Sequence, residues 1–373
     1  MKICILGNTE SVHNRKWCCH LAKMGHEVYL ISLHKSVAIS GVKVISFYSP
    51  LSRFLDIAFY LNKRKIEKLV KKIAPDVLHG QYLSDYGYYA SALNYNPFVA
   101  SGWGSDILIY PDIKRKYFDR IRLVLEKADC VTVEANYLAD HLRRRFKVPG
   151  KKIAVFPWGI RNDIFNRKSK KREVAALFKK YRIKQGSRVI FSPRSISLIY
   201  GIYVILGAIP VVLSKFPKVM FVFARGYSED NYLNSIKAFI KRDRLEKHIR
   251  ILDKLVTSKE MAAWFSVSEA FVSAPYSDAI SVSVLEGMAS GCIPVLTDIA
   301  ANRELVRDGV NGFIFKQKDP DSLTRKLLKV LTLKKKREEV IKNRNASLIA
   351  NKYTLKRSLD NLEKVYKKVA GLR

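Results

Sequence analysis

Short apolar runs that alternate with helical patterns constrain the fold of this chain most strongly. The runs predict a first series of strands at Lys2 to Leu6, Val28 to Leu33, Val77 to His79, Phe98 to Ser101, Cys130 to Glu134 and Ile153 to Phe156. A second series is predicted at Val189 to Ser192, Val219 to Ala224, Ile249 to Leu252, Ala270 to Val272, Ile293 to Leu296 and Phe313 to Phe315. Periodic segments between the runs, such as Val12 to Met24 before Gly25, predict helices. This alternation is typical of a doubly wound α/β fold.

The length of the chain predicts two domains. A chain of 373 residues is long enough for two hydrophobic cores, and its 48% hydrophobic content excludes disorder as the default. Pro, Gly and Asn-Asp interrupt the pattern in FPWGIRNDIF, which is therefore expected to link the domains. The predicted domains are 1–160 and 161–350, and 351–373 is expected to form a helix that packs back on the first domain. Ligands of such sheets bind beyond the carboxyl ends of the strands, so a site is expected in the cleft between the domains.

The five cysteines favour a reduced, cytoplasmic protein. They form no C-x-x-C pair, and the odd count argues against a disulfide framework or a structural zinc site. The first residues, MKICILGN, are expected to form a strand and not a signal peptide. No apolar run approaches the roughly 18 residues of a membrane-spanning helix. The cysteines are Cys4, Cys18, Cys19, Cys130 and Cys292.

Two acids, Asp278 and Glu286, stand eight positions apart in the second half. Asp278 is expected in the loop after a strand, and Glu286 on the first turn of a helix that Gly291 closes. An acid there can bind both hydroxyls of a ribose while the helix N-terminus faces phosphates. The alternative is an acid that only complements the helix dipole. Small residues are expected to let a ligand approach the backbone here: Ser281, Ser283, Gly287, Ala289, Ser290 and Gly291.

The segment from Ser277 to Phe315 resembles the nucleotide-sugar site of family-4 (group 1 type) glycosyltransferases, which are retaining enzymes of the GT-B fold. Their motif has two glutamates separated by seven residues, then EAMA-G-PV, a G-x-x-E and an N-G pair. Here Asp278 stands for the first glutamate, and Glu286 opens EGMASGCIPV. Asn302-Arg303-Glu304 and Asn311-Gly312 follow. The resemblance covers nearly the whole chain and implies two Rossmann-like domains that face each other across a cleft.

The resemblance also implies how the donor diphosphate is bound. Arg194 in PRSISLIYG matches a family arginine that neutralises the leaving group, and Tyr200 stands where the family has a lysine. Gly7 and Asn8 lie in the loop where the family has a Gly-rich turn. Further cations that could meet the phosphates are Lys184, Arg225 and Lys254. The catalytic set is Arg194, Asp278 and Glu286, and the remaining donor-binding positions are Leu255, Ala279, Ile280, Ser281, Val282 and Ser283.

Four residues of the first half are candidates for the acceptor side. Trp103 stands where family members often have a histidine that contacts the donor sugar, and an indole cannot serve as a general base. Asp106 could orient a hydroxyl or cap the next helix. His79 ends a predicted strand and His13 lies in the first loop; a lone histidine in such a place is more often structural.

Hydrolysis and metal chemistry are the enzymatic alternatives that the sequence disfavours. Two carboxylates could flank a glycosidic bond, but Asp278 and Glu286 lie within a nucleotide-binding pattern. Asp319-Pro320-Asp321 mimics a D-x-D metal motif, yet Pro at the start of a predicted helix favours a cap and first turn. We therefore expect no metal and no cofactor, with UDP as the expected nucleotide of the donor. Catalysis would rest on stabilising the leaving diphosphate and positioning the acceptor.

The net charge of +35, from 68 basic and 33 acidic residues, suggests an anionic partner. Leu51 to Lys72 combines aromatic and basic residues, and 323–373 carries sixteen basic and four acidic side chains. Nucleic acid is one partner of such surfaces, but no recognised nucleic-acid motif is present. A peripheral position on the anionic inner face of the cell membrane is favoured. A merely solvated basic surface is the alternative.

The sequence thus predicts a retaining glycosyltransferase that moves a sugar from a nucleoside-diphosphate sugar to a lipid-linked or cell-surface glycan. One rival is a GT-B scaffold that has lost transfer, suggested by Tyr200 and Trp103. Another is a GT-B sugar-nucleotide epimerase or phosphorylase.

Overall fold

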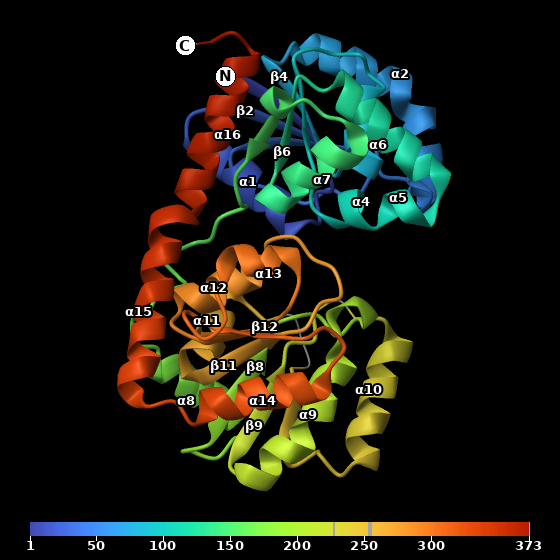
Figure 1. The fold of residues 1–373 in the computed structure, drawn as a ribbon. Helices are drawn as coiled ribbons and strands as arrows, with labels where there is room; N and C mark the ends of the chain where they lie inside the picture. The colour runs from blue at the N-terminus through green and yellow to red at the C-terminus, as the bar shows by residue number, and fades with distance from the viewer. Residues whose placement is uncertain (227, 253–255, 373) are drawn as a thin grey trace. The chain divides into compact units, whose positions relative to one another are not determined.

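The computed structural model describes residues 1–226, 228–252 and 256–372, which form two α/β units (Figure 1). One unit contains Met1–Trp158 and the segment that starts at Lys356, and the other contains Gly159–Leu355. These divisions fall a few residues from the boundaries expected at 160 and 350. Every strand pairing within each sheet is parallel. The predicted doubly wound α/β class is therefore confirmed.

Unit 1 has a seven-stranded sheet in the order β3-β2-β1-β4-β5-β6-β7. The strand order reverses between β1 and β4, where Ile3 pairs with Val28 on one side and with Val77 on the other. The strands are β1 Lys2–Leu6, β2 Glu27–Ser32, β3 Val42–Ser46, β4 Val77–Gln81, β5 Phe98–Ser101, β6 Cys130–Val133 and β7 Ile153–Val155. The helices are α1 Val12–Lys23, α2 Leu55–Ile73, α3 Tyr88–Ser91, α4 Ser105–Leu108, α5 Tyr110–Ile113, α6 Arg115–Lys127, α7 Asn136–Phe146 and α16 Leu355–Val369.

Strand β3 is the one strand of unit 1 that the apolar pattern missed. It lies at the edge of the sheet, and none of its residues is buried. A strand with so little burial carries no continuous apolar run, and such a run is the signal that identified the other strands.

Helix α16 belongs to unit 1 although it follows the whole of unit 2 in sequence. Its apolar face is buried through Leu359, Leu362 and Tyr366. The Tyr366 hydroxyl lies 2.5 Å from Nδ1 of His79 on β4. The C-terminal segment is thus part of the core of the first unit.

Unit 2 has a six-stranded sheet in the order β10-β9-β8-β11-β12-β13. Trp264, Phe265 and Phe271 are completely buried, and α14 packs beside α9 (Figure 1). The strands are β8 Arg188–Ser192, β9 Val219–Phe223, β10 Ile249–Ile251, β11 Ser268–Ser273, β12 Ile293–Thr297 and β13 Phe313–Phe315. The helices are α8 Lys171–Lys180, α9 Ile202–Lys215, α10 Asp230–Arg242, α11 Ser258–Val267, α12 Val282–Ala289, α13 Ala300–Leu305, α14 Pro320–Leu331 and α15 Lys335–Lys352.

Helix starts in unit 2 follow from local sequence. Asp319 caps α14 by accepting a hydrogen bond from the Ser322 amide, with Pro320 in the first position. This confirms that Asp319-Pro320-Asp321 forms a cap and first turn. Thr257 and Glu260 form a reciprocal capping box at α11. None of the described helices combines the length and apolar character needed to cross a bilayer.

Candidate functional site

Loops at the carboxyl ends of β8, β9 and β11 are joined to one another in unit 2. The amide of Tyr276, after β11, donates to the Ile199 carbonyl of the β8 loop at 2.8 Å. The amide of Ile196 donates to the Arg225 carbonyl, after β9, at 3.0 Å. Because β8 lies between β9 and β11, these bonds hold three loops at one edge of the sheet.

Two glycines allow these loops to approach closely. Gly201 has φ +57°, and a Cβ there would overlap the Ala274 carbonyl oxygen. Gly226 also has φ +57°, and a Cβ there would overlap the Ser195 side chain. A larger residue at either position would meet both backbone strain and a clash.

Arg194 is the centre of the charged part of this edge. Its Nη2 lies 2.9 Å from Oδ2 of Asp278, and the side chains are only 10% and 20% exposed. Its guanidinium carbon lies 4.1 Å from the centre of the Tyr200 ring. Nη1 also donates to the Ser281 hydroxyl, and Ser283 Oγ lies 3.5 Å away. The predicted cation is therefore fixed in position at the start of α12.

Burial and charge act in opposite directions on this ion pair. Burial raises the pKa of Asp278, and Arg194 with the Ala279 amide opposes that rise. Burial alone would lower the pKa of Arg194, but Asp278 and Tyr200 outweigh it and leave the pKa above its usual value. Removing either partner would leave a nearly buried charge without its counter-ion.

Glu286 lies in α12 but not where the sequence placed it. It is the fifth residue of Val282–Ala289, and no acid occupies the first turn. The prediction of a first-turn acid is therefore wrong, because the helix starts at Val282. Positions three apart share a helix face, so Glu286 lies on the face of Ser283, and both are half-buried.

The start of α12 has amides that no side chain caps. Ser281 is the residue before the helix, and it makes no capping hydrogen bond. The first amides that donate to a helix carbonyl are those of Val284 and Leu285, to Ser281. The amides of Val282 and Ser283 thus have no partner inside the helix, as at any helix start, and can bind an anion.

Some small residues of this segment are packed against other parts of the protein and do not make room for a ligand. A Cβ on Gly287 would lie 2.6 Å from Phe271 Cε1, and a Cβ on Gly291 3.0 Å from Arg167 Nε. The expectation that these two glycines let a ligand approach the backbone is therefore wrong. Three predicted donor positions are mostly buried, namely Ala279, Ile280 and Ser281.

The other candidate cations are not equivalent. Arg225 follows β9 and lies in the joined loops, where Nη2 is 3.8 Å from Asp230. Lys184 is exposed and precedes β8, so it lies toward the opposite edge of the sheet, and its assignment to the phosphates is wrong. Lys254 and Leu255 lie outside the described residues.

The first loop of unit 1 is organised by Asn14. The Gly7 amide donates to Ile31 O at 3.1 Å, and Asn14 Nδ2 donates to Asn8 O at 3.0 Å. A Cβ on Gly7 would lie 2.7 Å from Asn14 Nδ2. Gly7 is buried and Asn8 half-buried, so Asn8 is the member of this pair with accessible surface.

Aromatic rings gather near the ends of β4 and β5. The Trp103 ring centre lies 4.8 Å from that of Trp158 and 5.7 Å from that of His13. Tyr82 packs edge-on against Trp103 at 5.9 Å, and Trp103 Nε1 donates to Gln81 Oε1 at 3.0 Å. Trp103 and His13 thus lie together. Trp158, which belongs to the expected linker segment FPWGIRNDIF, joins them.

Asp106 and His79 are structural in this molecule. Both are completely buried. Asp106 accepts hydrogen bonds from the amides of Trp103, Gly104 and Leu83 at 2.8–2.9 Å, and burial raises its pKa to about 6. His79 contacts Tyr366 at 2.5 Å and Ser101 at 2.7 Å. Neither side chain has accessible surface, so neither can contact an acceptor directly in this structure.

Across 1–226, 228–252 and 256–372, no group of three or more His, Cys, Asp or Glu side chains is arranged to hold a metal ion.

Two family models match the chain. Residues 2–135 match "Glycosyl transferase 4-like", and residues 173–346 match "Glycosyl transferases group 1". Together they cover most of both units. The chain therefore belongs to the group 1 glycosyltransferases and has the GT-B fold.

Individual proteins agree with this family. The chain is 24% identical over 321 residues to alpha-monoglucosyldiacylglycerol synthase of Streptococcus pneumoniae, covering 79% of this chain and 69% of that one. It is 27% identical over 192 residues to phosphatidyl-myo-inositol mannosyltransferase of Mycobacterium tuberculosis, about half of each chain (50% and 49%). The crystal structure of Anabaena HepE in complex with UDP-glucose superposes with a TM-score of 0.78 at 14% identity, covering 98% of this chain and 99% of that one.

Proposed function

We propose that this protein transfers a sugar, with retention of anomeric configuration, from a nucleoside-diphosphate sugar to a lipid-linked or cell-surface glycan acceptor. The observation that carries the proposal is the position of Arg194 at the start of α12. Asp278 and Ser283 hold the cation there, and Glu286 lies on the same helix face as Ser283.

Each group has a role in this proposal. Arg194 and the amides at the start of α12 stabilise the negative charge that develops on the leaving diphosphate. Glu286 accepts hydrogen bonds from the ribose hydroxyls. Asp278 keeps Arg194 in position before the donor arrives. Tyr200 offers a hydroxyl and a ring face in place of the lysine that the family motif leads one to expect.

UDP is the nucleotide we expect, and no metal is assigned a step. A solved structure of the same fold is described as bound to UDP-glucose. In this chain a fixed guanidinium and helix amides can neutralise a diphosphate. The donor can be identified by thermal shift with UDP, GDP, ADP and CDP, in which one nucleotide should stabilise the protein most.

The proposed transfer is tested by release of nucleoside diphosphate from a panel of sugar nucleotides. A transferase releases it much faster when acceptor lipid extract is added. A protein that binds the donor and releases nothing under either condition would be a scaffold, and a changed sugar nucleotide without release would indicate an epimerase. Either outcome would overturn the proposal.

We further propose that α2 binds an anionic membrane. Its inner face is buried through Phe59, Ile66 and Val70. Ile57, Tyr60 and Leu61 are exposed on another face. Basic residues continue that exposed side along the next turns, namely Arg64, Lys65 and Lys68. Lys63 is half-buried beside Glu67, 3.4 Å away. Apolar side chains beside basic ones are the pattern of a helix that lies in a membrane interface. Two relatives, a phosphatidyl-myo-inositol mannosyltransferase and an alpha-monoglucosyldiacylglycerol synthase, are named for lipids. Their names support a lipid-linked acceptor.

Flotation with vesicles tests this position. Binding should require anionic lipid and decline with salt, because charge attraction is screened over about 8–10 Å. Replacing Lys63, Arg64, Lys65 and Lys68 with Ser should reduce binding and leave nucleotide affinity unchanged. Wild-type protein that ignores anionic vesicles at low salt would exclude the membrane role.

A further inference from the structure

Unit 2 contains a basic cavity at the end of α12 that lies away from Arg194. Its volume is about 290 Å³, and it is lined by the segment before α8, the ends of α11 and α12, and Lys342 of α15. Five of the residues lining it are basic and none is acidic. The eight residues of α12 span about 12 Å, so the cavity and the proposed donor site are at different ends of one helix.

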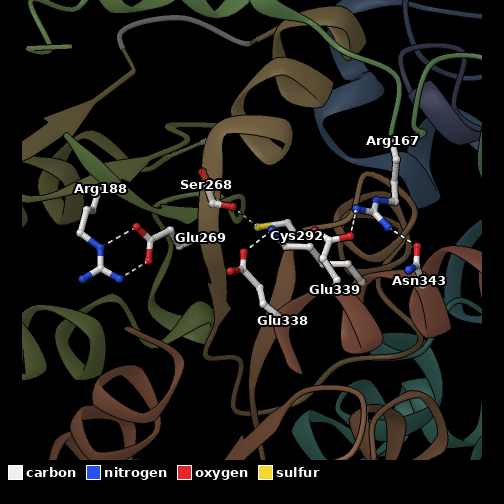
Figure 2. Close-up of polar contacts among 9 residues, drawn as sticks. Arg167, Arg188, Ser268, Glu269, Cys292, Glu338, Glu339 and Asn343 are labelled. Atoms are coloured by element: carbon white, nitrogen blue, oxygen red, sulfur yellow. Dashed lines mark hydrogen bonds and ion pairs between the residues drawn. The ribbon is translucent and has the colours of Figure 1, made fainter. Parts of the chain in front are cut away.

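Two of the five cations already have counter-ions. Arg167 Nη2 lies 2.7 Å from Glu339, and Arg167 also donates to Asn343, as Figure 2 shows. Lys342 pairs with Glu338. Lys168, Lys170 and Lys171 make no ion pair with any residue that the structure describes. Positive charge therefore remains uncompensated at this cavity.

The surroundings of Lys170 disfavour the positive charge on its amine. Its Nζ donates to the carbonyls of Asn166 and Lys168, each at 3.0 Å. Burial lowers the pKa of Lys170, with Glu173 opposing the shift. A bound anion would favour the charged form of this amine.

Ser290 provides a separate indication of a ligand. It lines the cavity and is only 5% exposed, yet its Oγ has no hydrogen-bond partner among the described residues. The hydroxyl is not needed to end α12, since the amides of Ser290, Gly291 and Cys292 donate to the carbonyls of Glu286, Met288 and Gly287. Buried hydroxyls are normally bonded. The Ser290 Oγ has almost no accessible surface of its own, so it would donate to a ligand oxygen after rotating toward the cavity that its residue lines.

The start of α8 adds backbone donors. Lys170 precedes the helix without a side-chain cap, and the first amide that donates within the turn is that of Val174, to Lys170. The amides of the first helix positions, Lys171 to Glu173, therefore lack helix carbonyls. Helix starts of this kind bind phosphate groups.

We propose that this cavity binds the phosphate group of a small soluble phosphate ester. Lys168 and Lys171 would supply charge, the α8 amides would donate to the phosphate oxygens, and Ser290 would donate from the interior. A cavity of about 290 Å³ is at the small end of ligand pockets, which suits a molecule of about the size of a sugar phosphate.

Calorimetry with glucose 1-phosphate at constant ionic strength tests the site, and we would use Arg194→Ala protein to remove the cation of the donor site. One saturable site is expected. Ser290→Ala should weaken binding about tenfold, because a hydrogen bond to a charged group is lost. Lys168→Gln with Lys171→Gln should weaken it by at least as much. Absence of saturable binding would overturn the proposal.

Two controls separate this site from general charge and from folding. Lys237→Gln with Lys241→Gln removes the same charge from exposed positions on α10 and should leave the affinity unchanged. An equal loss in that control would overturn the proposal. Without phosphate, Ser290→Ala should unfold at the wild-type temperature. Failure of the Glu286 or transfer experiments would not affect these results.

Vesicles containing phosphatidic acid distinguish a soluble ester from a lipid headgroup with the same phosphate chemistry. In flotation, Lys168→Gln with Lys171→Gln should bind like the α10 control pair. A selective loss of vesicle binding in the first variant would assign the cavity to a lipid headgroup and overturn the soluble ligand.

Discussion

The two sheets differ in what they place at the carboxyl ends of their strands. In unit 1, His79 at β4 and Asp106 after β5 are completely buried and hydrogen-bonded within the unit. The accessible surface there belongs instead to rings such as Trp103. In unit 2, Arg194 and Asp278 follow β8 and β11 and pair with each other while remaining partly exposed. The same parallel topology therefore presents aromatic rings in one unit and fixed charge in the other.

The difference shows that a titratable residue at a strand end is not by itself a functional residue. What matters is whether a distant segment covers it. Tyr366 of α16 covers His79 from 287 positions away, whereas the side chains of Arg194 and Asp278 stay 10% and 20% exposed. We therefore expect changes in unit 2 to affect nucleotide chemistry and changes at His79 to affect stability.

The largest expected effect is that of Arg194→Ala on turnover. If Arg194 stabilises the leaving group as proposed, its loss should lower kcat by about 100- to 1,000-fold. Steady-state release of nucleoside diphosphate measures this. Arg225→Ala, which removes a more exposed cation in the same loops, should cost much less. If Arg225→Ala is the more damaging change, the leaving-group cation has been assigned to the wrong residue.

The contribution of His79 to the free energy of unfolding should depend on pH. Burial lowers its pKa to about 3, below the value of about 6.5 in an unfolded chain. The folded state thus binds the proton less well, so stability is complete above pH 6.5 and declines as pH falls toward 3. From pH 7 to pH 5 the free energy of unfolding should fall by about 2 kcal/mol because of His79.

Urea unfolding of wild type and His79→Asn at both pH values isolates this contribution. The wild type should lose about 2 kcal/mol more than the variant over this interval, because the remaining histidines contribute equally to both proteins. Equal losses would mean that His79 is not held neutral in the folded state. Nucleotide affinity of the variant should match that of wild type.

Tyr200→Lys should have the smallest effect. It removes the ring that faces the Arg194 guanidinium, an interaction worth about 0.5–2 kcal/mol, but it supplies the cation that the family motif has. Diphosphate affinity measured by calorimetry should be equal to or higher than that of wild type. A tenfold loss would show that the tyrosine ring is needed to hold Arg194.

The strands were predictable because buried parallel strands are continuous apolar runs, and the exposed edge strand β3 lacked that signal. The cap at Asp319 was predictable because Pro320 fixes a helix start locally. The Arg194–Asp278 pair was not, since it joins two loops 84 positions apart in sequence. The burial of Asp106 was equally hidden, because it depends on the Leu83 amide from another loop.

We propose that the strand ends of unit 2 bind a nucleoside diphosphate through Arg194 and the face of α12. Calorimetric titration of UDP into wild type and Glu286→Ala tests it most directly, with exposed Glu246→Ala as the matched control. We predict that Glu286→Ala stays folded and loses about 10- to 100-fold in UDP affinity, as for a lost charged hydrogen bond, while Glu246→Ala binds UDP as the wild type does. Unchanged affinity in Glu286→Ala would contradict the account.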